Sequence, residues 1–361
     1  KEEVIILPDV LLTVEDKRDP TLPDFEKIYP VNKNYLSHIK WPDNHECAGQ
    51  NIELRDYQVE TINKFLEHHQ SIQEIATGAG KTIITAALCQ LVEPYGRTIT
   101  IVPNKSLVTQ TEEDFLVCNL DTGVYFGERK EIGRFNTIAT WQSLNVLEKK
   151  SKDEHTTDFE EFIKGINTVI IDEVHMAKAN VLKKLLTGPF AHCKMRWGLT
   201  GTVPKQNFEY YAIKCSIGEV THKIPAKELQ DKGVLAKCHV KILQTQEHGE
   251  HKNWKEEQGQ LTTPNKIYPE RLPWIVKKIE EISNTGNTLV LVDRVKCGEY
   301  LKKKLAEATF ISGATKNLER KEHYDEVSTA KSKIIIGTYG VASVGINIPR
   351  IFNLVLIESG K

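Results

Sequence analysis

The sequence predicts an α/β protein with two parallel-sheet domains in tandem, preceded by a short irregular segment. Short apolar runs alternate with helical patterns over residues 52–217, and a similar alternation resumes over residues 269–357. Apolar strands separated by helices are typical of a parallel sheet that is covered on both faces. The length of 361 residues also exceeds one ordinary core and suits two or three domains.

In the first alternation, the strand patterns are runs rich in Ile, Val and Thr, and the helical patterns repeat apolar residues three or four positions apart. The strands are predicted at Gln73–Ala76, Thr98–Val102, Thr137–Thr140, Thr168–Ile171 and Met195–Leu199. The helices are predicted at Asp56–Glu67, Lys81–Leu91, Lys105–Val117, Phe159–Lys164 and Ala179–Leu186.

The second alternation follows a short helix at residues 225–233, an alternating strand pattern at Lys237–Gln244 and a polar connector at Thr245–Pro264. Helices are then predicted at Pro269–Ser283, Lys296–Ala308 and Leu318–Ser328, and strands at Thr288–Val292, Phe310–Ser312, Lys333–Gly337 and Leu354–Ile357. We therefore place two domains at residues 51–222 and 223–361. Residues 1–50, which contain five prolines, are predicted to be a linker or the remnant of an accessory domain.

Composition limits the classes of function. The 48 basic and 49 acidic residues give a net charge of −1, so any nucleic acid must be bound by local lysines and backbone amides. The seven cysteines form no C-x-x-C pair, which argues against a disulfide framework or a zinc site. No run of eighteen apolar residues occurs, so no membrane span is expected.

A glycine-rich loop follows the first predicted strand and precedes a helix. It reads Thr-Gly-Ala-Gly-Lys-Thr, and such a loop can wrap phosphate oxygens in backbone N–H groups. Lys81 would reach the β- and γ-phosphates of ATP, and the Thr82 hydroxyl would bind Mg²⁺. The alternative is a glycine-rich turn without a ligand, which its place between a strand and a helix disfavours. The other residues expected to contact the nucleotide are Thr77, Gly78, Ala79 and Gly80.

A second chemical pattern follows the apolar strand that ends at Ile171. Asp172 would hold Mg²⁺, and Glu173 would orient and deprotonate the attacking water. Adjacent carboxylates are common on protein surfaces, but this pair lies downstream of the phosphate loop and is followed by His175. We therefore expect Lys81, Asp172, Glu173 and His175 to be the catalytic residues.

This set of motifs resembles the superfamily 2 helicases of the DExH type, and the resemblance covers about residues 52–361. It implies two RecA-like domains, ATP and Mg²⁺ as cofactors, and DNA as the partner. It also implies that Gln58 reads the adenine, and that Thr200 and Thr202 couple hydrolysis to movement of the strand. The first-domain residues that it assigns to the nucleic acid are Pro103, Asn104, Lys105, Thr140 and Gln142.

The second half continues the resemblance. Thr338 and Tyr339 correspond to nucleic-acid contacts, and Gly345 and Asn347 to nucleotide contacts. Asn347 stands where the family more often has Asp, so this residue brings no charge to a ribose hydroxyl. The chain is most similar to the UvsW-type DNA helicases of tailed phages, on the segments Thr140–Gln142, Gly218–Val220, Gly233 and Tyr339–Ser343. This implies a cytoplasmic protein, in the host cytoplasm if a phage encodes it.

One family motif is not found in the sequence. The pattern Gln-x-x-Gly-Arg-x-x-Arg, whose arginines neutralise the γ-phosphate, should follow the strand Leu354–Ile357, but Glu358–Lys361 does not contain it. We therefore expect the second domain to be truncated. We also expect this chain to bind ATP but to hydrolyse it slowly.

The resulting hypothesis is an ATP-dependent DNA helicase or translocase that remodels branched DNA in recombination, repair or replication. Its partner would be single-stranded or branched DNA, and an RNA–DNA hybrid stays open as a substrate. Two alternatives remain: the motor subunit of a restriction or repair complex, and a nucleotide-dependent clamp on nucleic acid. Protein partners are not predicted by the sequence.

Overall fold

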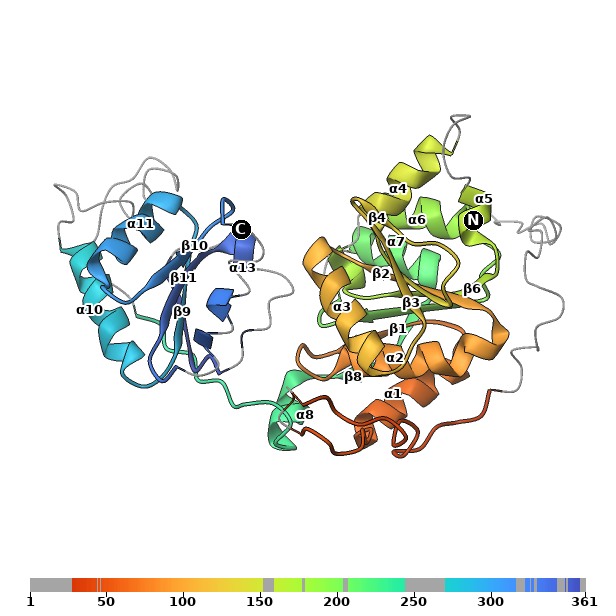
Figure 1. The fold of residues 1–361 in the computed structure, drawn as a ribbon, viewed down its shortest axis with the longest axis horizontal. Helices are drawn as coiled ribbons and strands as arrows, with labels where there is room; N and C mark the ends of the chain where they lie inside the picture. Colours follow the sequence, from red (N-terminus) through yellow and green to blue (C-terminus); the bar gives the residue numbers. More distant parts are fainter. Residues whose placement is uncertain are drawn as a thin grey trace, which may run out of the picture. The chain divides into compact units, whose positions relative to one another are not determined.

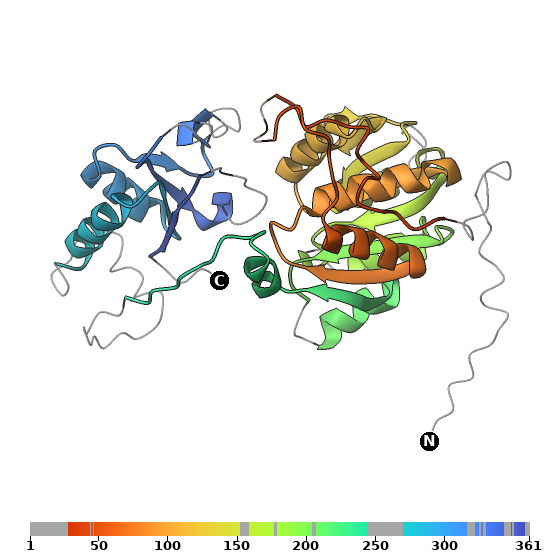
Figure 2. The same ribbon diagram turned by 90° about the horizontal axis from the view of Figure 1, so that it is seen from below.

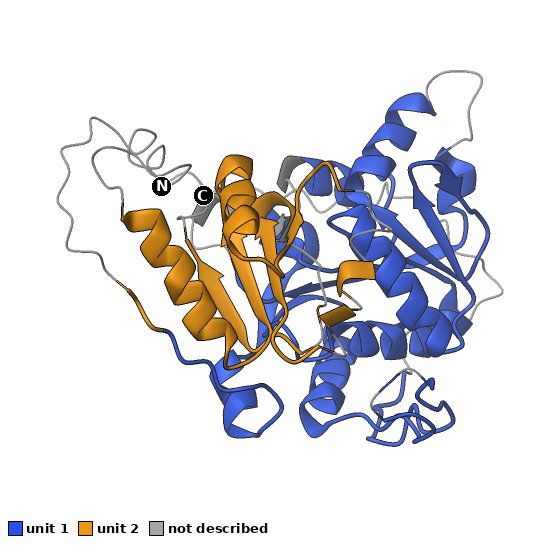
Figure 3. Cartoon of the chain, turned by 60° about the vertical axis from the view of Figure 1, so that its left-hand side comes forward, with its two compact units in different colours: residues 1–240 blue, residues 241–361 orange. Residues whose placement is uncertain are grey.

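The computed structural model describes residues 28–43, 45, 47–151, 159–176, 179–203, 207–243, 270–315, 322–324, 326–327, 330–342, 348 and 350–357. The chain divides into two compact units, residues 1–240 and 241–361 (Figure 3). Among the described residues, each unit has one sheet. The predicted tandem of two parallel-sheet domains is therefore confirmed.

The sheet of the first unit contains eight strands in the order β4-β3-β5-β2-β6-β7-β1-β8 (Figure 1). All neighbours pair in parallel except β3 and β4, which form an antiparallel hairpin. The carboxyl ends of the parallel strands therefore meet at one edge. The strands are β1 (Gln70–Ile75), β2 (Arg97–Val102), β3 (Thr122–Phe126), β4 (Arg129–Lys130), β5 (Asn136–Thr140), β6 (Ile166–Ile171), β7 (Met195–Thr200) and β8 (Glu219–Ile224).

Two apolar cores separate this sheet from the helices on its faces. One core contains buried side chains of α1 (Asp56–Glu67), α2 (Lys81–Val92) and α3 (Lys105–Val117), which Figure 2 shows side by side over the sheet. The opposite core contains side chains of α4 (Trp141–Lys150), α5 (Phe159–Ile163), α6 (Ala179–Thr187) and α7 (Asn207–Ile217). Two short 3-10 turns, η3 (Glu93–Tyr95) and η4 (Val174–Met176), also belong to this unit.

Residues 28–50 lie on the first unit through buried contacts. Leu36 and Ile39 are in the same core as α1, and the backbone of Val31 makes two hydrogen bonds with the side chain of Asn63. At the other end, β8 pairs with β1, and Leu229 of the short helix α8 (Ala226–Asp231) is buried in that core. The predicted boundary at residues 222–223 thus falls inside β8, which is part of the first unit.

The second unit has a parallel sheet in the order β10-β11-β9-β12. Its strands are β9 (Thr288–Val292), β10 (Thr309–Ile311), β11 (Ile334–Thr338) and β12 (Asn353–Leu356). The helices α10 (Arg271–Ser283) and α11 (Val295–Lys304) pack in one apolar core against β9 and β11, and the short helix α13 (Tyr339–Ala342) follows β11.

Most of the predicted elements that fall on described residues agree with the structure. The predicted helix Leu318–Ser328 lies partly, and the predicted connector Thr245–Pro264 wholly, outside the described residues. The bounds of α1, α3 and β9 agree to the residue. The hairpin β3–β4, the helices α4 and α7 and the strand β8 were not predicted, since their mixed composition gives no clear period. The predicted strand Lys237–Gln244 is wrong over residues 237–243, which pair with no strand and expose the side chains of Val240 and Ile242.

No helix in the described parts of the chain is both long enough and apolar enough to span a membrane.

The side chain of Asn287 connects three segments of the second unit. It is fully buried, its Nδ2 donates to the carbonyls of Val327, Ala330 and Arg350, and its Oδ1 accepts from the Lys333 amide at 2.8 Å.

We predict that Asn287→Ala lowers the stability of this unit by about 3 kcal/mol or more, because buried backbone groups lose their partner. Hydrogen exchange at the amides of β9 and β11 measures the change. Asn284→Ala, at an exposed position, is the control, and equal protection in the two variants would contradict the prediction.

Candidate functional site

The phosphate loop connects β1 to α2, at the carboxyl edge of the first sheet. Gly78 and Gly80 have φ angles of 83° and 76°, in the left-handed region that favours glycine. A Cβ at Gly80 would lie 2.6 Å from Nε2 of Gln58, so no other residue fits there without moving that side chain. The loop therefore depends on glycine both for its conformation and for its space.

Two side chains of α1 hold this loop by hydrogen bonds to its backbone. The Tyr57 hydroxyl donates to the carbonyl of Ala79 at 2.9 Å, and Gln58 Nε2 donates to the same oxygen at 3.2 Å. Gln58 Oε1 also accepts from the amide of Arg55, and the whole side chain is 6% exposed. Gln58 thus supports the loop in this structure, and its contact with adenine stays a prediction. The sequence did not single out Tyr57.

The lysine of the loop contacts both carboxylates of the second pattern. Lys81 is the first residue of α2, and Asp172 and Glu173 follow β6, whose carboxyl end lies at the same edge of the sheet. Lys81 Nζ donates to Glu173 Oε1 and lies 3.9 Å from Asp172 Oδ1. All three side chains are at most 19% exposed. Lys81 and the two carboxylates, which follow it by 91 and 92 positions, thus form one partly buried charge cluster.

The electrostatics of this cluster raise the pKa of Asp172 to about 6. Burial is the main cause and the charge of Glu173 adds to it, whereas Lys81 acts in the opposite direction. Glu173 has a φ of 48°, a left-handed conformation that is costly for a residue with a side chain. Its amide donates to Asp172 Oδ1 at 2.9 Å, which ties the two carboxylates together.

His175 connects the carboxylates to the end of β7. Its Nδ1 lies 2.7 Å from Thr200 Oγ1 and 3.4 Å from Glu173 Oε2. The Thr200 hydroxyl donates its one proton to the carbonyl of Thr202 at 2.7 Å, so the proton between His175 and Thr200 must be on Nδ1. Burial, with Lys81 also contributing, lowers the pKa of His175 in spite of Glu173. The predicted coupling residues Thr200 and Thr202 are thus in hydrogen-bond contact with the predicted catalytic site.

The predicted nucleic-acid residues of the first unit lie together at the ends of β2 and β5. Asn104 Oδ1 caps α3 by accepting from the Leu107 amide, and Thr140 caps α4 by accepting from the amide of Ser143. Gln142 Nε2 donates to the carbonyl of Pro103 at 3.2 Å, which joins the two segments. The side chains of Lys105 and Gln142 are exposed.

In the second unit, Thr338 ends β11 and Tyr339 begins α13. Gly345 and Asn347 lie outside the described residues, so their predicted contacts with nucleotide stay predictions.

Leu235 is a further residue at the phosphate loop that the sequence did not indicate. It follows α8, and a Cβ at Gly78 would lie 2.9 Å from its Cδ2. Its amide donates to the carbonyl of Leu229 at 3.1 Å, which fixes the turn after the helix. An apolar residue in a mixed segment gives no sequence signal for such a contact.

A glycine loop between a parallel strand and a helix, with carboxylates at the end of a nearby strand, is the architecture of nucleoside-triphosphate-binding proteins. Comparison with known proteins gives a narrower class. Residues 51–205 match the family described as type III restriction enzyme, res subunit. The chain is 25% identical to putative helicase 22 of Sulfolobus islandicus filamentous virus, over 86% of this chain and 60% of that protein. It is 22% identical to the ATP-dependent DNA helicase UvsW of Enterobacteria phage T4, over 87% of this chain and 64% of that protein.

A solved structure supports the fold across both units. The helicase Lhr of Mycobacterium smegmatis, bound to single-stranded DNA and AMP-PNP, covers 83% of this chain and 41% of that chain with a TM-score of 0.56 at 17% identity. The predicted resemblance to superfamily 2 helicases of the UvsW kind is confirmed, and so are two RecA-like domains. The chain spans 60–64% of the length of the two curated relatives above.

The raised pKa of Asp172 leads to a prediction about stability. Its folded-state pKa of about 6 exceeds the ordinary value of 3.8, so above pH 6 the ionised Asp172 lowers the free energy of unfolding. We predict that Asp172→Asn stabilises the nucleotide-free chain at pH 8 by about 1–3 kcal/mol.

This gain should shrink as the pH falls from 6 towards 4, because Asp172 itself becomes protonated. Urea denaturation at pH 8 and pH 5 measures the change. Asp121→Asn, on a carboxylate that is 40% exposed and pairs with Arg134, is the control. A gain of equal size at both pH values would contradict the assigned pKa.

Proposed function

We propose that this protein is an ATP-dependent DNA helicase or translocase that remodels branched DNA in recombination, repair or replication. The observation that carries the proposal is the contact of Lys81 with Glu173 and Asp172, which joins the phosphate loop to a candidate water-activating site. DNA helicase names among the relatives support DNA as the partner. Branched DNA is what the resemblance to the UvsW-type helicases implies, and the two viral relatives favour the host cytoplasm.

ATP binding would change the partners of this charge cluster. Lys81 would leave Glu173 for the β- and γ-phosphates, and Glu173 would become free to accept a proton from the attacking water. The Thr82 hydroxyl and Asp172 carboxylate are hard oxygen ligands that suit Mg²⁺, which neutralises phosphate charge when it is bound. The nearby cation would also favour the ionised form of Asp172 and thereby offset the effect of burial on its pKa.

His175 would transmit this change of partners to Thr200. In this structure Nδ1–H of His175 donates to Thr200, and Nδ1 lies 3.4 Å from Glu173 Oε2. A Glu173 side chain that rotates towards the attacking water would weaken the longer of these two contacts. The bond between Thr200 and Thr202 would then carry the change into the segment that follows β7. This is the coupling role that we propose for the two threonines.

The motor subunit of a restriction or repair complex would use the same site. The family match over residues 51–205 supports this second candidate. A clamp on nucleic acid would not need a group that activates water. The partly buried Glu173 beside Lys81 therefore favours a hydrolase over a clamp.

Glu173→Gln separates the hydrolase from the clamp. Gln keeps the shape of the side chain and an acceptor for Lys81, but it cannot take a proton. We predict a loss of DNA-stimulated phosphate release of about 10²-fold or more, with ATP binding retained. Phosphate release and equilibrium binding of a fluorescent ATP analogue measure the two quantities in the protein at its natural length. Glu67→Gln, in an exposed ion pair with Lys64, is the control. Unchanged turnover in Glu173→Gln would favour the clamp.

The absence of the arginine motif from these 361 residues leads to a separate proposal. We expect this chain to bind ATP and to hydrolyse it about 10³-fold more slowly than a relative that has the motif, since an arginine at the γ-phosphate contributes that much. Turnover by the 361 residues at the rate of such a relative would overturn this proposal and leave the first one intact.

A further inference from the structure

The turn that follows α8 lies against the phosphate loop. Cδ2 of Leu235 is 2.9 Å from the position that a Cβ would take at Gly78, so the leucine fills the space beside the Cα of this glycine. Leu235 also packs against the apolar core that contains side chains of α1 and α2. It belongs to none of the sequence motifs assigned above. The contact is therefore a feature of the phosphate loop that the predicted site does not include.

The backbone holds Leu235 in this place. The amides of Val234 and Leu235 both donate to the carbonyl of Leu229, at 2.8 Å and 3.1 Å. Leu229 is fully buried, and Gly233 has a φ of 70°, which lets the chain turn back after α8. The position of the leucine is thus set by a hydrogen-bonded turn that is anchored in the core.

The loop is held on both sides of Gly78. The Ala76 amide donates to the carbonyl of Ile224 at 3.0 Å, and the Ala79 carbonyl accepts two hydrogen bonds from α1. Gly78 lies between these anchors, with a φ of 83° and no side chain of its own to pack. Leu235 therefore supplies, from outside the loop, the apolar contact that Gly78 cannot make.

This contact bears on how tightly a phosphate is bound. Glycine has more backbone freedom than any other residue, and a loop that must be ordered when its ligand arrives has a lower affinity for that ligand. A leucine side chain beside the Cα of Gly78 removes part of this freedom before the ligand is bound. The loop amides are then already placed for phosphate oxygens.

We propose that Leu235 is a positioning residue for the phosphates of the nucleotide and that it acts through Gly78. The inference rests on the proposed function, because it concerns the same ATP site. Its ligand is the phosphate chain of a nucleoside triphosphate or diphosphate, which the loop would bind through its amides. Coupling between two sites is reciprocal, so bound phosphate would in turn hold Leu235 and the turn after α8 in place.

The first test compares Leu235→Ala with Leu235→Met in the protein at its natural length. Leu235→Ala should raise the KM for ATP on the order of tenfold and leave the kcat of DNA-stimulated hydrolysis little changed, because it removes an ordering of the loop that precedes the chemical step. Leu235→Met keeps an apolar side chain of similar volume and should restore most of the affinity. Val240→Ala, in the same segment at a side chain that is 82% exposed, is the matched control. Thermal unfolding shows whether each variant is folded.

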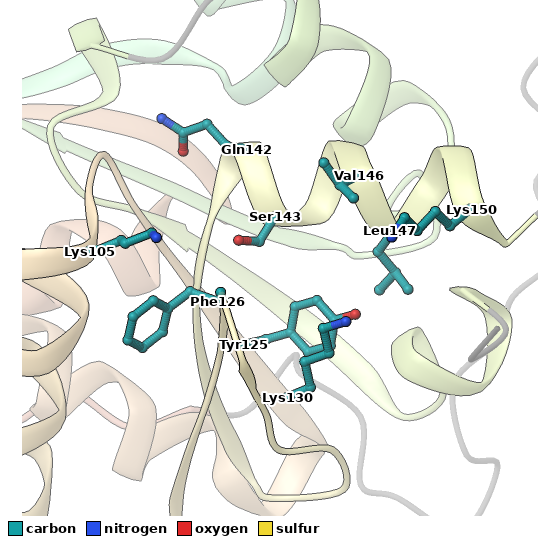
Figure 4. Close-up of a pocket in the computed structure, with 10 residues that line it drawn as sticks. Lys105, Tyr125, Phe126, Lys130, Gln142, Ser143, Val146, Leu147 and Lys150 are labelled. Carbon is teal, nitrogen blue, oxygen red and sulfur yellow. The ribbon is translucent and has the colours of Figure 1, made fainter.

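The binding of DNA is a second readout. The strand β1, which leads into the phosphate loop, is separated from β2 by β6 and β7. Lys105 and Gln142, which are predicted to hold the nucleic acid, line a pocket between the β3–β4 hairpin and α4 (Figure 4). Leu235→Ala should therefore leave the affinity for a single-stranded oligonucleotide unchanged when no nucleotide is present. A general loss of structure in the first unit would lower both affinities and would contradict the proposal.

A label on Cys238 tests the reciprocal effect. Cys238 is exposed and follows Leu235 by three positions, and the other cysteines that are not buried are Cys47 and Cys215. With Cys47→Ser and Cys215→Ser in place, an environment-sensitive fluorophore on Cys238 should change its emission when AMP-PNP and Mg²⁺ are added to the 361 residues. Leu235→Ala should abolish this change even at saturating AMP-PNP. In the matched control the label is on Cys215 of α7, Cys47 and Cys238 are replaced by serine, and the emission should stay constant.

The outcomes separate this inference from the proposed function. An unchanged KM in Leu235→Ala, or a Cys238 label that does not respond while AMP-PNP is bound, would overturn the inference alone. Equal losses of affinity in Leu235→Ala and Val240→Ala would also overturn it. Nucleotide binding that is weakened by Leu235→Ala, without any DNA-stimulated hydrolysis, would support the inference and overturn the proposed function. No binding of ATP by the unchanged chain would overturn both.

Discussion

The first unit is organised around the ammonium group of Lys81, which contacts two carboxylates at the edge of a parallel sheet. Lys81 comes from the helix after β1, and Asp172 and Glu173 come from the end of β6, so the contact exists only when the whole sheet between them is formed. Burial makes the charges expensive, which is why the pKa of Asp172 is raised although a lysine lies beside it. The arrangement therefore favours an incoming ligand that brings both a metal cation and phosphate charge.

The residues around this cluster each hold one part of it in position. Tyr57 and Gln58 both bond the carbonyl of Ala79, so α1 fixes the loop from which Lys81 extends. On the other side, His175 joins Glu173 to Thr200, and Thr200 is in turn bonded to Thr202. A change at the carboxylates can therefore pass to the segment after β7 through the contact of Glu173 with His175 and the hydrogen bonds of Thr200. This gives the proposed coupling role of the threonines a physical path.

The sequence predicted the parts of the fold and the site that depend on local pattern. The phosphate loop, the two carboxylates and most of the parallel strands follow from glycine spacing and from apolar runs that end in polar residues. The side-chain contacts within the site did not follow from the sequence. Gln58 supports the loop, a role that required the distance from α1 to Ala79, which no spacing along the chain reveals. The hairpin β3–β4 was missed because its mixed composition gives no clear period, and the ion pair that positions it joins Arg129 to Glu112, seventeen residues earlier.

Leu235 extends the same reasoning to the segment that leaves the first unit. Its side chain lies against Gly78, in the loop that would wrap the phosphates, and the turn that holds it is closed by a backbone bond to α8. Gly78 has no side chain to separate the two, so the chain that continues towards residue 241 starts in contact with the nucleotide loop. A phosphate that draws the loop amides towards itself would change the surface on which Leu235 rests. The contact thus gives nucleotide binding a direct physical route to the segment that connects the two units.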